Sequence, residues 1–103
     1  MLLHSEIEAN AIIPFLRTIV AKRLIEKYDL TQQQAATKLG ITQATISNYK
    51  NRSRENIELY LITKRIESFA NDIAVMIMKN TSEIEISEMF ETTLQFIRGQ
   101  NII

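Results

Sequence analysis

A glycine at position 40 separates two short segments that each open with a helix-start signal, and this pattern constrains the fold most. Thr31 is followed three residues later by Gln34, which is the spacing of a capping box at a helix N-terminus. Gly40 can adopt the left-handed conformation that ends a helix, and Thr42 can cap the helix that follows. The sequence therefore predicts two helices joined by a tight turn, the second of which runs to about Asn51.

The second of these segments carries side chains that can read the edges of base pairs. Amides form paired hydrogen bonds with adenine, hydroxyls pair with several bases, and a methyl group packs on that of thymine. Ile46 and Tyr49, three residues apart, would hold the helix on the rest of the fold. The candidate base-contacting residues are Gln43, Ala44, Thr45, Ser47 and Asn48.

Charge is distributed unevenly along a chain whose net charge is zero. Residues 1–54 hold eight cations and four acids, whereas residues 55–103 hold four cations and eight acids. No acid occurs between Asp29 and Glu55, which suits a surface that approaches DNA phosphates. The candidate phosphate-contacting residues in this stretch are Thr42, Lys50, Arg52 and Arg54.

Residues 31–49 resemble the helix-turn-helix of the phage repressor and Cro class, also called the XRE type. The resemblance implies an all-α DNA reader whose second helix enters the major groove. It also implies that Gln32 contacts a phosphate and braces Gln43. More of the chain, on both sides of this unit, is similar to a family of short archaeal transcription regulators. The positions that match the repressor pattern are Gln32, Ala36, Gly40, Ile41 and Ile46.

Helical periodicity before the motif predicts a further helix that ends near Tyr28. Pro14 leaves two interpretations, because proline is tolerated in the first turn of a helix but kinks its interior. The helix either starts near Ile13, or starts at a capping box of Ser5 with Glu8 and kinks at the proline. We favour the longer, kinked helix.

Two helices are predicted after the motif. Apolar residues at steps of three and four indicate a long amphipathic helix over residues 54–79. The acidic piece at residues 83–87 can be a loop or a helix turn, and Ser87 then caps a short last helix that ends at Gly99. The chain is thus divided into a helix-turn-helix DNA-binding core at residues 1–54 and a helical C-terminal dimerisation element at residues 55–103.

The apolarity of the last two helices predicts a homodimer. A two-fold DNA reader places its recognition helices in successive major grooves roughly 34 Å apart on a near-palindromic site. The same helices can instead fold back on the core of their own chain, and the sequence leaves this open. The candidate dimerisation residues are Ile66, Phe69, Ile73, Met76, Ile77, Phe90 and Leu94.

The sequence offers little catalytic or metal-binding chemistry. It has one histidine, no cysteine and no Gly-rich phosphate loop, so we expect no enzyme activity, no cofactor, no metal and no small-molecule ligand. Without a run of 18 apolar residues or a signal peptide, a cytoplasmic location is expected. The predicted function is a sequence-specific transcription regulator that binds double-stranded DNA as a homodimer. The alternative is a protein-interaction or antitoxin-like module that uses a helix-turn-helix fold.

Overall fold

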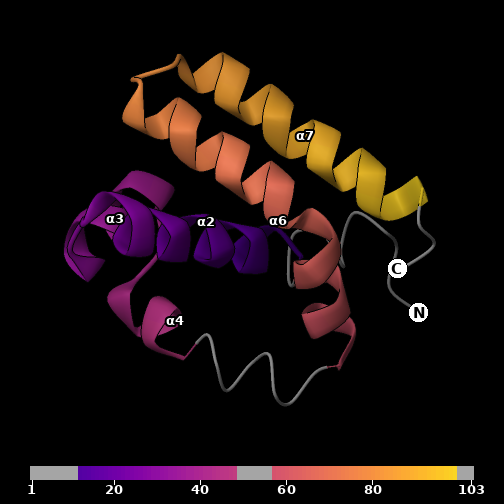
Figure 1. The fold of residues 1–103 in the computed structure, drawn as a ribbon, viewed down its shortest axis with the longest axis horizontal. Coiled ribbons are helices and arrows are strands. Elements are labelled where there is room, and N and C mark those ends of the chain that lie inside the picture. Colours follow the sequence, from indigo (N-terminus) through magenta and orange to yellow (C-terminus); the bar gives the residue numbers. More distant parts are fainter. Residues whose placement is uncertain (1–11, 49–56, 100–103) are drawn as a thin grey trace.

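The structure is a computed structural model that describes residues 12–48 and 57–99, and every regular element in these ranges is a helix (Figure 1). The predicted all-α fold class is therefore confirmed for this part of the chain. None of these helices combines the length and the hydropathy needed to cross a membrane. The elements are α2 (Ile13–Tyr28), α3 (Gln32–Leu39), α4 (Gln43–Ser47), α6 (Ile57–Met78) and α7 (Glu83–Gly99).

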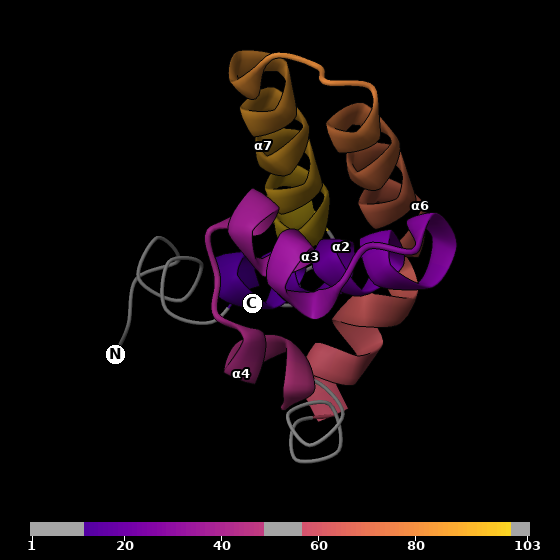
Figure 2. The same cartoon turned by 90° about the vertical axis from the view of Figure 1, so that its left-hand side faces the viewer.

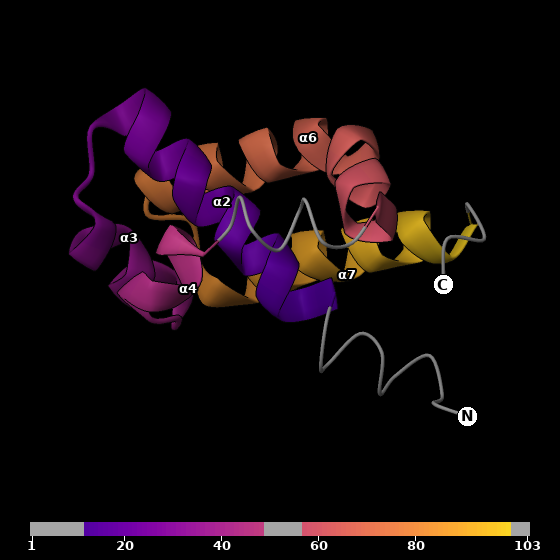
Figure 3. The same cartoon turned by 90° about the horizontal axis from the view of Figure 1, so that it is seen from below.

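Helix α2 is at the centre of the fold and packs against α3, α4 and α6. Figure 2 shows α6 and α7 side by side as an antiparallel pair, with α2 crossing beneath them. From below, α2 and α4 lie in front of this pair (Figure 3). The helix-turn-helix and the α6–α7 hairpin thus form two packed layers. Helix α4 lies on the side of the first layer that is opposite the hairpin (Figure 1).

One hydrophobic core joins the two layers. Phe15 and Leu16 of α2 are 1% and 0% exposed, and they share a cluster with buried residues from every other described helix. The C-terminal helices therefore fold back on the N-terminal core, which is the alternative that the sequence left open. Ile66, Ile73 and Leu94 were expected at a dimer interface, but they are 0%, 0% and 3% exposed within one chain. Core packing in the single chain leaves these three side chains no surface for a partner.

Pro14 lies in the first turn of α2, where its missing N–H interrupts no intrahelical bond. The hydroxyl of Thr18 donates to the Pro14 carbonyl oxygen at 2.9 Å, which satisfies that acceptor in the buried side of the helix. Ile12 already has helical dihedral angles, with φ −73° and ψ −48°. The proposed capping box of Ser5 and Glu8, and with it the upstream part of a longer kinked helix, lies outside the described residues.

The last helix starts earlier than the sequence predicts, at Glu83 and not after Ser87. Asn80 ends α6 with a left-handed φ of 57°, and the Ser82 hydroxyl then accepts the Glu85 N–H at 3.3 Å. Glu83 and Glu85 fall in the first turn of α7, where negative charge interacts favourably with the helix dipole. The acidic piece is therefore the start of a helix of 17 residues, and the prediction of a short last helix is wrong.

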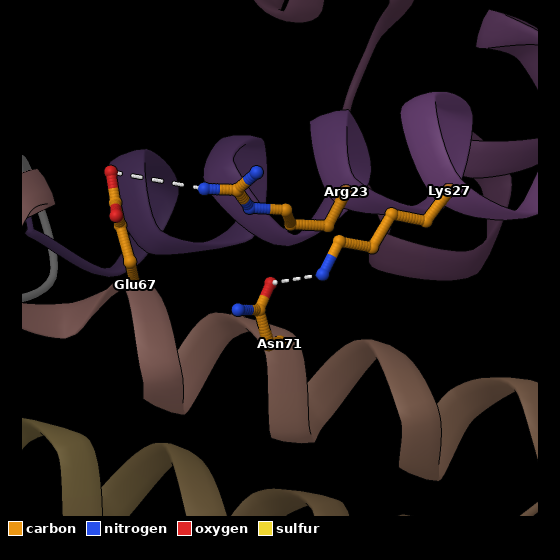
Figure 4. Close-up of polar contacts among 4 residues, drawn as sticks. All are labelled: Arg23, Lys27, Glu67 and Asn71. Atoms are coloured by element: carbon orange, nitrogen blue, oxygen red, sulfur yellow. Dashed lines mark hydrogen bonds and ion pairs between the residues drawn. The ribbon is translucent and has the colours of Figure 1, made fainter.

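Two polar contacts connect α2 to α6 across the rim of the core (Figure 4). An Arg23 guanidinium nitrogen lies 3.8 Å from a Glu67 carboxylate oxygen, and Lys27 Nζ donates to Asn71 Oδ1 at 3.5 Å. The two contacts are one helical turn apart, since four residues separate Arg23 from Lys27 on α2 and Glu67 from Asn71 on α6. Together they fix the register of α2 against α6. These two cations of the N-terminal half thus serve packing within the chain.

Candidate nucleic-acid interface

The turn between α3 and α4 has the geometry that the sequence predicts. Gly40 has a φ of 66°, and the N–H groups of Gly40 and Ile41 donate to the carbonyl oxygens of Thr37 and Ala36 at 3.3 and 3.0 Å. This pair of bonds is the Schellman motif, in which a left-handed residue satisfies the last carbonyls of a helix. The turn therefore fixes the direction in which the chain enters α4.

Side-chain caps define where both helices start. The Thr31 hydroxyl accepts the Gln34 N–H at 3.1 Å, and the Gln34 side-chain oxygen accepts the Thr31 N–H at 2.9 Å, which confirms the capping box. Thr42 caps α4 by accepting the Thr45 N–H at 3.2 Å. The hydroxyls of Thr42 and Thr45 are also 2.8 Å apart and share a hydrogen bond. These local bonds set the N-terminus of α4 without help from a distant element.

Helix α4 is shorter than predicted, because it ends at Ser47. Asn48 has φ −86° and ψ 3°, which is outside the helical region, and its N–H donates to the Ala44 carbonyl oxygen at 3.0 Å. The expected extension toward Asn51, together with Tyr49, falls on residues outside the described ranges.

Few side chains hold α4 on the fold. Ile46 is 2% exposed and enters the core, whereas Ile41, at the turn, is half-buried. Ala35 and Ala36 are 0% and 4% exposed, and their small side chains let α3 approach α2 and α4 closely. One face of α4 is thus committed to packing and the remaining faces are presented outward.

The structure leaves four of the five predicted base-contacting residues exposed: Gln43, Ala44, Ser47 and Asn48. Thr45 differs, since it is half-buried and its hydroxyl is bonded to that of Thr42. The exposed members present an amide, a methyl, a hydroxyl and a second amide on one short helix and its C-terminal residue. That set includes a donor and an acceptor together with an apolar group, as direct contact with base edges requires.

Gln32 is exposed at the first position of α3, and its side-chain oxygen accepts from the Ser47 hydroxyl at 3.5 Å. The resemblance implied that Gln32 braces Gln43, but the bond observed is with Ser47 at the other end of α4. Ser47 is one turn beyond Gln43 and lies on the same side of the helix. The contact ties the start of α3 to the end of α4.

The predicted phosphate contacts are only partly within the described residues. Thr42 is exposed at the cap of α4, while Lys50, Arg52 and Arg54 lie outside the described ranges. Lys38, in the last turn of α3, is a further exposed cation of the N-terminal half of the chain. The Lys38 side chain lines a cavity between the two layers. No sequence pattern indicated this cavity.

The fold and these contacts define a class of protein: a helix-turn-helix scaffold that presents a short polar helix to solvent. Residues 22–57 match the family model described as helix-turn-helix, and the match covers the end of α2 and all of α3 and α4. The match supports the resemblance of this segment to the helix-turn-helix of the repressor and Cro type. No curated protein and no solved structure matches the chain.

Proposed function

We propose that the protein is a sequence-specific transcription regulator that binds double-stranded DNA as a homodimer. The observation that carries this proposal is the exposed polar surface of α4, held by caps and a Schellman turn inside a helix-turn-helix domain. A transcription regulator must share a compartment with the DNA that it binds, so the proposal includes a cytoplasmic location.

In this proposal α4 enters the major groove and its exposed side chains meet base edges. Gln43 and Asn48 suit adenine, Ala44 suits the thymine methyl, and Ser47 accepts or donates at either base. Thr45 supports this surface through its bond to Thr42 and presents its methyl group. Gln32 and Thr42 at the helix starts contact phosphates, as do Lys50, Arg52 and Arg54 beyond α4.

A second copy is proposed to pack on the α6–α7 hairpin. Two of the residues predicted at the interface, Phe69 and Met76, are half-buried and seven residues apart, which places them on one side of α6. On α7, Met89 and Phe96 have the same spacing and are also half-buried. The Phe69 and Phe96 rings are 5.1 Å apart, so Met76 and Met89 fall at the next matching position of the antiparallel pair. We call these four residues the hairpin face.

The hairpin face is suited to self-association because it is apolar and incompletely covered by its own chain. Phenylalanine supplies large contact areas, and methionine adapts its shape to a partner. Ile77 and Phe90, the remaining predicted interface residues, are half-buried and line the cavity against α2 and α3. The proposed dimer therefore uses Phe69 and Met76 from the prediction, with Met89 and Phe96 added.

A fluorescence-anisotropy titration of the full chain with a random duplex at low salt tests the DNA-binding proposal. Binding that weakens steeply as salt rises is the expected result, because phosphate contacts release counterions. Selection from a random duplex pool should then return a site with two-fold symmetry. Absence of duplex binding at low salt would overturn the proposal and favour the alternative, a protein-interaction module.

A further inference from the structure

A cavity of about 430 Å³ lies between the two layers of the fold. It is lined by residues of α2, the end of α3, the end of α6 and the part of α7 from Glu83 to Leu94. Small-molecule sites in proteins start at about 300 Å³ and are concave, mostly apolar and equipped with a few converging polar groups. The cavity is therefore large enough for a small ligand.

The α7 wall of the cavity consists of two parallel stripes. Ile86, Phe90 and Leu94 recur at every fourth position and form an apolar stripe that includes the buried Leu94. Glu83 and Glu91, with Ser87 between them, form a polar stripe beside it at the same spacing. One helix thus supplies both an apolar floor and an acidic edge.

Two cations line the cavity from the helix-turn-helix layer. Arg17 follows Ile13 by one turn of α2, and Lys38 precedes the buried Leu39 at the end of α3. Within the described ranges, no hydrogen bond or ion pair joins either cation to Glu83 or Glu91. Charges of opposite sign therefore line one cavity without neutralising each other directly.

We infer that this cavity binds a small amphoteric molecule with an apolar body, of which a free α-amino acid with a large aliphatic or aromatic side chain is the simplest. Its carboxylate meets Arg17 and Lys38, its ammonium group meets Glu83 and Glu91, and its side chain lies on the apolar stripe of α7. A purely apolar ligand would leave the four charges unused. A ligand with charge of one sign would satisfy only one edge of the cavity.

The position of the cavity gives the ligand contact with both layers. Lys38 and Leu39 directly precede the Gly40 turn that leads into α4, and Ile77 belongs to α6. An occupant therefore bridges the helix-turn-helix and the hairpin. Binding itself is independent of the DNA-binding proposal, so the two are tested separately.

Isothermal titration of the full chain in the absence of DNA provides the test. The probes are leucine and phenylalanine, each with its decarboxylated amine and its deaminated acid. The expected result is saturable one-to-one binding of at least one amino acid, with affinity up to about fivefold above that of each single-charge analogue, since an exposed charge contact contributes up to about that factor. No binding by either amino acid, or equal affinity for all three forms, would overturn the inference.

Paired charge removals locate the site. Arg17→Gln with Lys38→Gln should abolish the preference for the amino acid over its amine while leaving the affinity for the amine unchanged. Glu83→Gln with Glu91→Gln should abolish the preference for the amino acid over its deaminated acid while leaving the affinity for the deaminated acid unchanged. Lys79→Gln and Glu85→Gln, which remove exposed charges outside the cavity, should leave every affinity unchanged. If the control substitutions weakened binding as much as the cavity substitutions, the ligand site would not be this cavity.

Discussion

The Ser47 hydroxyl lies 3.5 Å from the Gln32 side-chain oxygen, and this contact joins the end of α4 to the start of α3. Both side chains are exposed, so the bond orients groups at the surface and adds little to the stability of the core. In the proposed complex with DNA, Gln32 holds a phosphate while Ser47 faces the groove. The bond therefore couples the placement of the backbone contact to that of the base contact.

Substitution of Gln43 tests base recognition. Gln43→Ala is expected to cost about 1–3 kcal/mol of binding free energy on the selected site and to relax the preference at one base pair. The loss follows because a paired amide contact to a base edge has no replacement in alanine. Anisotropy titrations with the selected duplex and with single-base variants measure both effects. Unchanged affinity and unchanged preference would remove Gln43 from the base-contacting set.

Substitution of Arg52 should have a different signature. Arg52→Ala is expected to weaken binding to all duplexes alike and to reduce the slope of log affinity against log salt by about 1, because one phosphate contact is lost. Titrations over a series of salt concentrations with specific and random duplexes provide the measurement. Loss confined to the selected site would instead indicate a base contact.

The effect of a substitution at Gly40 on stability should come from backbone conformation alone. A Cβ at Gly40 meets no heavy atom within 4 Å, but the φ of 66° is unfavourable for residues with a side chain. Gly40→Ala should therefore lower the free energy of unfolding by about 1–2 kcal/mol. Gly99→Ala is the matched control, since a Cβ there also meets nothing and no positive φ is present. Urea unfolding of both variants measures the difference, and equal stabilities would contradict the assigned turn.

Ile46 should anchor α4 to the core. Because it is 2% exposed, Ile46→Ala removes buried apolar surface and is expected to cost about 2–5 kcal/mol of stability. Chemical denaturation measures this cost. Ala44→Ser, on the exposed side of the same helix, should change stability by less than about 0.5 kcal/mol. A small effect of Ile46→Ala would mean that α4 is not held through this side chain.

A charge on the hairpin face should prevent self-association without unfolding the chain. Met76→Glu places a carboxylate among apolar groups of both copies, so the proposed dimer should dissociate to monomers. Ile84→Glu is the control, because Ile84 is 74% exposed and lies outside the hairpin face. Sedimentation equilibrium distinguishes the two species. Dimers that persist in Met76→Glu, or a monomeric parent protein, would reject this interface.

Local signals in the sequence were sufficient to predict the two helices and their turn. The capping box, the αL glycine and the Thr42 cap each involve residues within a few positions, so tertiary packing does not override them. Helix ends set by weaker preferences were less predictable. The chain leaves the helical region at Asn48, earlier than predicted, and α7 starts after Ser82 and not after Ser87.

Contacts between distant segments could not be predicted in the same way. Apolar periodicity marks which face of a helix is buried, but it does not say whether its own chain or a partner buries it. The sequence pattern therefore fits Ile66 and Leu94 equally well as interface residues and as core residues, and the structure places both in the core. The cavity combines residues of four helices, and the Arg17 and Glu91 side chains that line it are far apart in the sequence.

Chemical-shift mapping during titration with the selected duplex tests the central claim most directly. The account predicts the largest amide shifts in α4 and at Gln32, with the acidic α7 helix unperturbed by direct contact. Saturable binding that shifts α7 and the hairpin face but leaves Gln43, Ser47 and Asn48 unchanged would contradict it.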